Sequence, residues 1–191
     1  MIRNFQLFCN LNRIRRSDFL LLQDSLTSLN PSTLICPACG ASHCCTLHAH
    51  YFRDFICISG NSAAIHSVKI PRLICSSCRH THAVLPACLI PHASFSLFFI
   101  LTVLRSYFLH TDTVENLCSR FSISCSTLYS WLKLFSLHKE LWLGVLENAA
   151  CSSLDFLLFL SDCSDFLQSF FLRFRFSFLQ QHHVATFSHR T

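Results

Sequence analysis

Two Cys-x-x-Cys pairs constrain the fold of this chain more than any other feature. The first is Cys36-Pro-Ala-Cys39-Gly, and the second is Cys75-Ser-Ser-Cys78-Arg. Each pair offers two thiolates at a spacing that suits adjacent corners of a tetrahedron around Zn²⁺. Chance spacing or disulfide pairing is the alternative. Because apolar dipeptides, Leu34-Ile35 and Leu73-Ile74, lead into both pairs, we predict one zinc site with Cys36, Cys39, Cys75 and Cys78 as its ligands.

The cysteine content indicates a reducing compartment. The chain has 13 cysteines in 191 residues, an odd number that leaves one thiol unpaired in any full disulfide scheme. Its first residues lack the apolar core of a signal peptide and lead into the basic cluster Arg13-Ile-Arg15-Arg16. We therefore expect a cytoplasmic protein in which zinc uses four thiols and the others are buried as small apolar groups.

Short strands are expected around the two cysteine pairs. Tyr51–Ile58 and Ile65–Ile70 are rich in aromatic and β-branched residues, with turn-forming residues 59–62 between them, and a third strand is expected at Thr81–Leu85. Three such strands and two metal-binding turns make a zinc ribbon. A module this small has little apolar surface, so metal binding would supply much of its folding free energy, on the order of 10 kcal/mol.

Histidines crowd this module. His80 and His82 follow the second pair and are candidates to point back at the metal as hydrogen-bond donors to its ligands. A second zinc site at residues 43–50, from His43, Cys44, His48 and His50, is a further hypothesis. Surface imidazoles on strands are the alternative for each histidine taken singly.

The rest of the chain favours helices. Phe95–Leu104 is apolar but half the length that a bilayer crossing needs, which indicates a buried helix that Arg105 ends. The pattern of apolar residues from Ser17 to Asn30 predicts an amphipathic helix. We expect an α+β, mainly helical fold with four parts: an N-terminal helical arm at 1–33, a zinc ribbon at 34–90, a helix-turn-helix at 91–137, and a helical C-terminal region with a loose tail at 138–191.

Residues 113–133 have the pattern of a helix-turn-helix. Leu117, Cys118 and Phe121 repeat at helical spacing, residues 122–124 interrupt, and Leu128 and Trp131 resume on one face of a second helix that Ser124 is placed to cap. Any antiparallel helical pair shows part of this pattern, but the whole favours DNA binding. The residues expected to contact duplex DNA are Arg120, Ser124, Ser126, Thr127, Ser130 and Lys133, with Tyr129 at the edge of the face. A solvated helix surface is the alternative.

The two motifs together resemble the zinc-ribbon and helix-turn-helix head of bacterial insertion-sequence transposases, and more closely a family of short uncharacterised proteins with the same head. The resemblance covers residues 34–135 and rests on Cys36-Pro-x-Cys39-Gly, Tyr51, Arg53, Ile70-Pro-Arg-x-x-Cys75-x-x-Cys78, Leu85-Pro86 and Phe121-x-Ile-Ser124-x-Ser-Thr-Leu-Tyr-x-Trp131. It implies a mobile-element or regulatory protein associated with the bacterial nucleoid. Ser122 departs from it, because glycine commonly holds that turn position.

A catalytic role is not expected. Transposases of this kind carry three metal-binding carboxylates in an α/β domain, whereas the C-terminal acids here, Glu140, Glu147, Asp155, Asp162 and Asp165, lie in a region that favours helices. No nucleophile elbow or glycine-rich phosphate loop is present. The net charge of +5 is compatible with a polyanionic partner.

The prediction is a zinc-stabilised, non-catalytic protein whose partner is duplex DNA, with neither a membrane nor a small-molecule substrate, and with a second copy or a transposase as a further partner. A truncated or accessory transposase component is one alternative. A zinc-ribbon protein-interaction module is the other.

Overall fold

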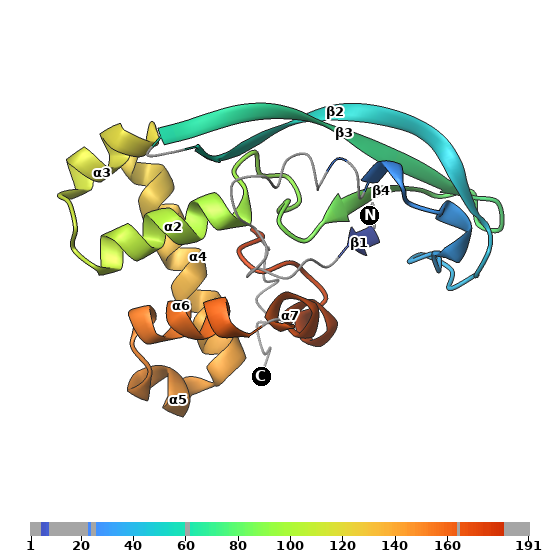
Figure 1. The fold of residues 1–191 in the computed structure, drawn as a ribbon. Helices are drawn as coiled ribbons and strands as arrows, with labels where there is room; N and C mark the ends of the chain where they lie inside the picture. Colours follow the sequence, from blue (N-terminus) through green and yellow to red (C-terminus); the bar gives the residue numbers. More distant parts are fainter. Residues whose placement is uncertain (1–4, 8–22, 24–25, 60–61, 164, 182–191) are drawn as a thin grey trace, which may run out of the picture.

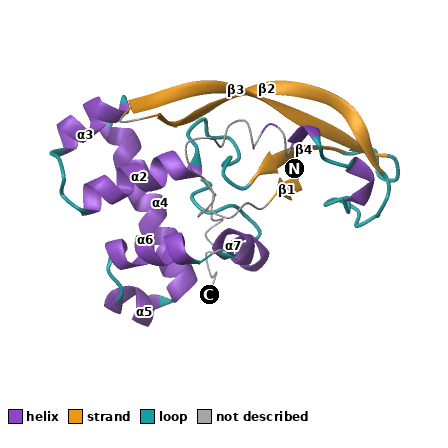
Figure 2. Ribbon diagram, in the orientation of Figure 1, coloured by secondary structure: helices purple, strands orange, loops and turns teal. Residues whose placement is uncertain are grey.

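The computed structural model describes residues 5–7, 23, 26–59, 62–163 and 165–181, which Figure 1 shows as a ribbon. Strands and helices are both present, so the α+β class predicted from the sequence is confirmed (Figure 2). The strands are β1 (Phe5–Leu7), β2 (Cys45–Ser59), β3 (Ser62–Cys75) and β4 (Thr81–Pro86), with a 3-10 turn at Pro31–Thr33. The α-helices are α2 (Leu97–Phe108), α3 (Val114–Phe121), α4 (Cys125–Leu143), α5 (Val145–Ala150), α6 (Ser153–Asp162) and α7 (Phe166–Phe174).

Strands β2 and β3 form one long antiparallel hairpin that arches over the other elements (Figure 1). Its residue pairs run from Cys45–Cys75 at one end to Ser59–Ser62 at the tip, with a register shift between Leu47 and Ala49. The strands predicted at Tyr51–Ile58 and Ile65–Ile70 were therefore too short, whereas the strand predicted at Thr81–Leu85 agrees with β4. The physical reason is that each half of the hairpin has its own core to pack on, whereas an isolated two-stranded hairpin is marginally stable in water.

Two hydrophobic clusters support the hairpin. Along the middle of the hairpin, Phe55, Val68 and Ile70 are buried in one cluster with residues of β4. Near the tip, Ile56 and Ile58 pack against the core of the helical region instead. A pair of hydrogen bonds reinforces the second contact, because Ile56 donates to the carbonyl of Ser94 and accepts from the amide of Ser96, just before α2 begins.

The sheet has the order β1-β4-β3-β2, and β1 pairs parallel with β4. The N-terminal arm at 1–33 was predicted to be helical, but its residues 5–7 form a strand. Pairing with these residues satisfies backbone amide and carbonyl groups along the outer edge of β4. The helix predicted from Ser17 to Asn30 lies mostly outside the described residues. Gln23, Leu26 and Thr27 are helical, and Leu26 is buried in the sheet-side cluster.

Helix α2 is the buried helix predicted from the apolar run, displaced toward the C-terminus. Its cap is Ser96, whose hydroxyl accepts from the amide of Phe99 at 3.0 Å. The helix continues past Arg105 to Phe108, since a basic side chain in the last turn interacts favourably with the helix dipole and does not end a helix. Phe95 instead forms a parallel bridge to Ile56.

The boundary expected at residue 137 falls inside α4, and one cluster of buried side chains extends from Ala87 to Leu179. Gly144, at φ 82°, separates α4 from α5. The C-terminal region predicted to be helical contains α6 and α7, and both contribute phenylalanines to this core. The tail predicted to be loose lies outside the described residues beyond position 181. In the described ranges, no helix combines the length and apolar character needed to cross a bilayer.

Candidate metal centre and helix-turn-helix

The four cysteines of the two Cys-x-x-Cys pairs come together at the open end of the hairpin. Their sulfur atoms all lie within 4.8 Å of one another. The Sγ–Sγ distance is 3.7 Å between Cys36 and Cys78 and 3.8 Å between Cys39 and Cys75. A tetrahedron with metal–sulfur bonds of about 2.3 Å has edges of about 3.8 Å. The predicted grouping of these four ligands is confirmed, and their geometry fits a four-coordinate metal ion.

Both metal-binding turns are built in the same way. In the first, the amide of Gly40 donates to the carbonyl of Cys36 at 2.9 Å, and in the second, the amide of Arg79 donates to the carbonyl of Cys75 at 2.8 Å. Gly40 and Arg79 occupy the left-handed region, at φ 75° and 63°. Glycine adopts this conformation without strain, so only the first turn carries the residue type that favours it.

Backbone donors prepare Cys75 for binding a cation. The amide of Cys78 hydrogen-bonds the Cys75 sulfur, and together with the amide of Ser77 it lowers the pKa of Cys75 to about 6 although the side chain is buried. A thiolate is the form that binds metal. These backbone donors therefore favour the metal-binding form of Cys75.

A fifth cysteine lies against the site. Cys45 is buried and stands opposite Cys75 in the β2–β3 register. Burial, with the charges of Cys36 and Cys75 next in importance, raises the pKa of Cys45 to about 11. Cys45 thus remains a neutral thiol beside the ligands. Sequence reasoning could not single out Cys45 among the other cysteines and histidines of this module that were open as replacement ligands, because only the strand register places it across from Cys75.

The two histidines after the second turn have different environments. His82 is buried, with its Nε2 atom 3.4 Å from the sulfur of Cys36. His80 is exposed, and its Nδ1 atom lies 3.1 Å from the carbonyl oxygen of Cys78. The expectation that a histidine points back at a ligand sulfur is met by His82 alone. Among the described residues, the four cysteines are the only close group of potential metal ligands, so the second site at 43–50 is not formed.

Helices α3 and α4 form the helical pair predicted from the second motif. Thr113 caps α3 by accepting from the amide of Asn116 at 3.3 Å, and Ser124 caps α4 by accepting from the amide of Thr127 at 3.1 Å. Between them, Ser122 has φ 52° and ψ 45°, the left-handed conformation that ends α3. The turn has its expected backbone geometry although serine replaces the usual glycine.

The buried face of this pair follows the sequence pattern closely. Leu117, Cys118, Phe121, Leu128 and Trp131 are all buried, while Ile123 is half-buried between the helices. The ring centroid of Trp131 lies 5.0 Å from that of Phe95 in an edge-on contact, which joins α4 to the start of α2. Packing of the pair is therefore as predicted.

The residues expected to contact DNA lie at the outer side of the same pair. Ser124, Ser126 and Lys133 are exposed, whereas Thr127 and Ser130 are half-buried. Tyr129, expected at the edge of the face, is 54% exposed and lies between them along α4. The hydroxyl oxygen of Ser124 lies 2.8 Å from that of Ser126 and 2.8 Å from that of Thr127.

Arg120 has a partner within the protein. Its Nη1 atom is 2.6 Å from Asp112 Oδ2, and its guanidinium carbon lies 4.7 Å from the ring centroid of Phe121. This ion pair tethers the loop before α3 to the end of α3. A phosphate contact by Arg120 would have to compete with this ion pair. The sequence pattern did not indicate that Asp112 would be its partner.

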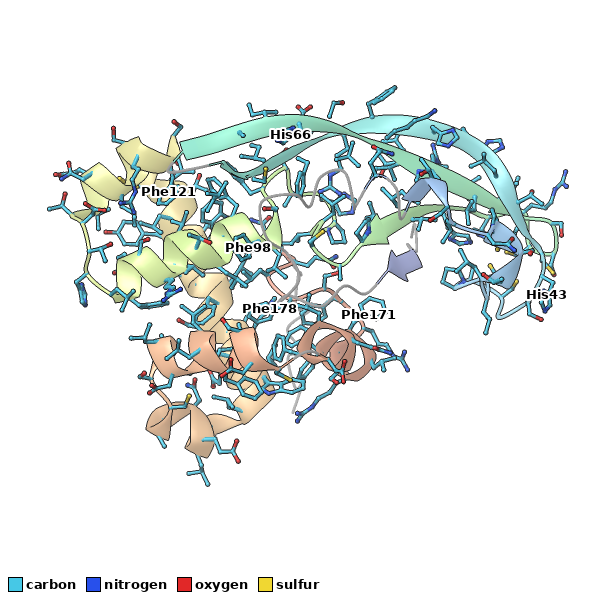
Figure 3. All side chains as sticks on the ribbon, viewed as in Figure 1. His43, His66, Phe98, Phe121, Phe171 and Phe178 are labelled. Atoms are coloured by element: carbon cyan, nitrogen blue, oxygen red, sulfur yellow. The ribbon has the colours of Figure 1, made fainter. Side chains whose placement is uncertain are left out.

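The two sites lie at opposite ends of the hairpin. The cysteine turns adjoin the Cys45–Cys75 end, and the tip lies beside α3. Figure 3 shows His43 at the first end and Phe121 of α3 at the second. With a rise of about 3.3 Å per residue, the strands between them have a contour length of about 45 Å. Metal ligands and helix-turn-helix therefore make no direct contact.

The C-terminal acids are dispersed. Asp162 ends α6 and Asp165 precedes α7, both exposed, so the spacing of three residues does not place them on one helix. Asp155 accepts from the hydroxyl of Ser152, its own helix cap. In the described part of the chain, no carboxylate belongs to a close group of metal-ligating atoms.

Comparison with protein families gives one match, to a domain of unknown function (DUF6431), over residues 36–131. The chain belongs to this family. The DUF6431 region begins at Cys36, the first of the four clustered cysteines, and ends at Trp131 in α4, so it contains both the cysteine centre and the α3–α4 helical pair. Helices α5 to α7 lie beyond it. No curated protein and no solved structure matches the chain.

Proposed function

We propose that this DUF6431 protein is a zinc-stabilised, non-catalytic DNA-binding protein of mobile-element or regulatory type that acts in the cytoplasm on the chromosome. The observation that carries the proposal is the α3–turn–α4 unit, in which a capped helix presents its first turns to solvent. Such a helix is the element that helix-turn-helix proteins insert into the major groove. The resemblance to transposase heads supports the same function.

The chemistry of the exposed face suits a polyanion. Short hydroxyls at Ser124 and Ser126 are able to contact phosphates or base edges, and Lys133, about two turns further along α4, is able to neutralise a phosphate. Free amides at the start of α4 add a partial positive charge in the same place. The aromatic ring of Tyr129 supplies an apolar surface between these polar groups.

The metal centre has a structural role in this proposal. Four thiolates in tetrahedral geometry, without an open position, are typical of structural zinc sites. Bound zinc would cross-link the two turns and hold the open end of the hairpin closed. Because the hairpin tip packs on the helical core, metal binding at the open end would also stabilise the strands against which the helical core packs.

The test combines metal analysis with a binding measurement. We expect about one zinc per chain by elemental analysis after purification without chelator, and salt-dependent binding of a labelled random-sequence duplex. Lys133→Ala should weaken binding and flatten the slope of log affinity against log salt by about one unit, as loss of one phosphate contact does. Arg120→Ala should do the same only where the arginine leaves Asp112 in the complex.

Lys69→Ala is the matched control. Lys69 is exposed on β3, and its removal changes the net charge by the same amount as loss of Lys133. An equal effect of both substitutions would mean that only overall charge matters and would refute the docking face. Zinc without any DNA binding would favour the protein-interaction alternative.

A further inference from the structure

We propose that His82 is a positioning residue for the metal centre: its imidazole donates an N–H···S hydrogen bond to Cys36 and holds that ligand in place. This inference deepens the proposed function, because it rests on metal binding by the four cysteines. It does not depend on DNA binding. The relevant contact is the 3.4 Å approach of His82 Nε2 to Cys36 Sγ.

The surroundings of His82 make this contact significant. His82 is 1% exposed, and its neighbours along β4, Ala83, Val84 and Leu85, are buried in the sheet-side hydrophobic cluster. A polar ring in such a place costs free energy unless its nitrogen atoms are hydrogen-bonded. Because a thiolate only accepts hydrogen bonds, we assign a hydrogen to Nε2, which makes the sulfur of Cys36 its acceptor.

The backbone explains why His82 reaches this sulfur. His82 pairs with Leu73 in the β3–β4 register, two residues before the ligand Cys75. β4 therefore runs beside the strand that delivers the second cysteine pair. Cys36 comes from the other turn, so the His82 contact crosses from one half of the site to the other. His82 thereby links the two turns independently of the metal.

Cys36 receives this donor on its buried side. Cys36 and Cys75 are buried at 1% and 0% exposure, whereas Cys39 is exposed. Donors that hydrogen-bond metal ligands fix the ligand orientation and reduce the charge on the sulfur, and loss of such a donor typically costs about 10- to 100-fold in metal affinity. We expect a similar contribution from His82.

The test uses cobalt(II) as a spectroscopic probe in the full chain, after the zinc content of the wild-type protein has been measured. His82→Leu places an apolar side chain of comparable size in the buried position and removes the donor. His82→Gln restores an N–H near the position of Nε2. His80→Ala is the matched control, since His80 is exposed and contacts a carbonyl oxygen, not a sulfur.

We expect His82→Leu to release metal to a chelator about 10-fold faster or more, and to shift the thiolate-to-cobalt charge-transfer bands to longer wavelength because the sulfur lone pair loses its donor. His82→Gln should recover part of both effects, and His80→Ala should match the wild type. Faster release with unchanged bands in His82→Leu would indicate a packing role alone and overturn the proposal. Unchanged bands and unchanged release would overturn it as well.

Failure of the underlying metal centre gives a different result. A wild-type protein that binds neither zinc nor cobalt would refute both the metal site and the role of His82. A wild-type protein that binds one metal, with a His82→Leu variant indistinguishable from it, would refute only the role of His82.

Discussion

Arg53 in β2 donates through Nη2 to the carbonyl oxygen of Ile90 at 2.5 Å, and through the same nitrogen to the carbonyl oxygen of Ala93. This arginine thus joins the hairpin to the segment that leads into α2. Burial lowers the pKa of Arg53 below its usual value, and the two carbonyls compensate for the lost hydration. The contact is part of what holds the sheet and the helices together.

Arg53→Leu should lower the free energy of unfolding by about 2 kcal/mol, because two carbonyl oxygens would lose a charged donor. Urea denaturation followed by far-UV circular dichroism measures this change. Arg105→Leu is the control, since Arg105 is exposed on α2, and it should change stability by less than about 0.5 kcal/mol. Equal effects of the two substitutions would show that the Arg53 contacts contribute nothing specific.

Ser122→Gly should stabilise the protein by up to about 1 kcal/mol. A non-glycine residue in the left-handed region carries a cost of about this size, which glycine avoids. Ser122→Ala retains the strain and should give no gain. A thermal or urea unfolding curve in which glycine and alanine at this position behave alike would contradict the assigned conformation.

Cys45→Ala should keep one equivalent of metal, whereas Cys75→Ser should lose it. Cys45 is outside the group of four mutually close sulfurs, although it is buried beside them. Elemental analysis of the two variants measures the difference. Loss of the ribbon in Cys75→Ser should leave most of the helical circular dichroism signal, because the helices have a separate core. Metal loss from Cys45→Ala would add Cys45 to the ligand set.

Metal binding should weaken as the pH falls through about 6. The pKa of Cys75 is lowered to about 6 by backbone donors, so its thiolate predominates above that pH and is protonated below it. Protons compete with the metal for this ligand, and the stabilisation that the thiolate provides is lost in the same direction. A titration of the cobalt charge-transfer bands between about pH 8 and 5 follows the transition. Equal metal affinity at the two ends of this pH range, measured by competition with a chelator, would contradict this mechanism.

Local patterns proved sufficient for several features. Ser124 was predicted to cap α4 from its place before an apolar repeat, and its hydroxyl accepts from Thr127 as expected. Leu128 and Trp131 were predicted to face the core, and both are buried. Capping and helical periodicity depend on residues within four positions of one another, so one stretch of sequence contains the information.

Element lengths were predicted less well. Tyr51–Ile58 was expected as a strand, but β2 begins at Cys45, and α2 extends four residues beyond Leu104. Alternation of apolar residues marks only the part of a strand with one buried face. The ends of β2 follow instead from its pairing with β3 and from the two cores beneath the hairpin.

The sequence alone determined the set of four candidate ligand cysteines and the helical pair around Ser122, because spacing within each short motif limits what its side chains can do. Tertiary structure decided which neighbours those motifs have: His82 against Cys36, Cys45 across from Cys75, Arg53 on the loop before α2, and Asp112 on Arg120. The contacts of His82, Cys45 and Arg53 each join separate strands or segments. Such contacts depend on strand register and on packing between elements, which no local pattern encodes.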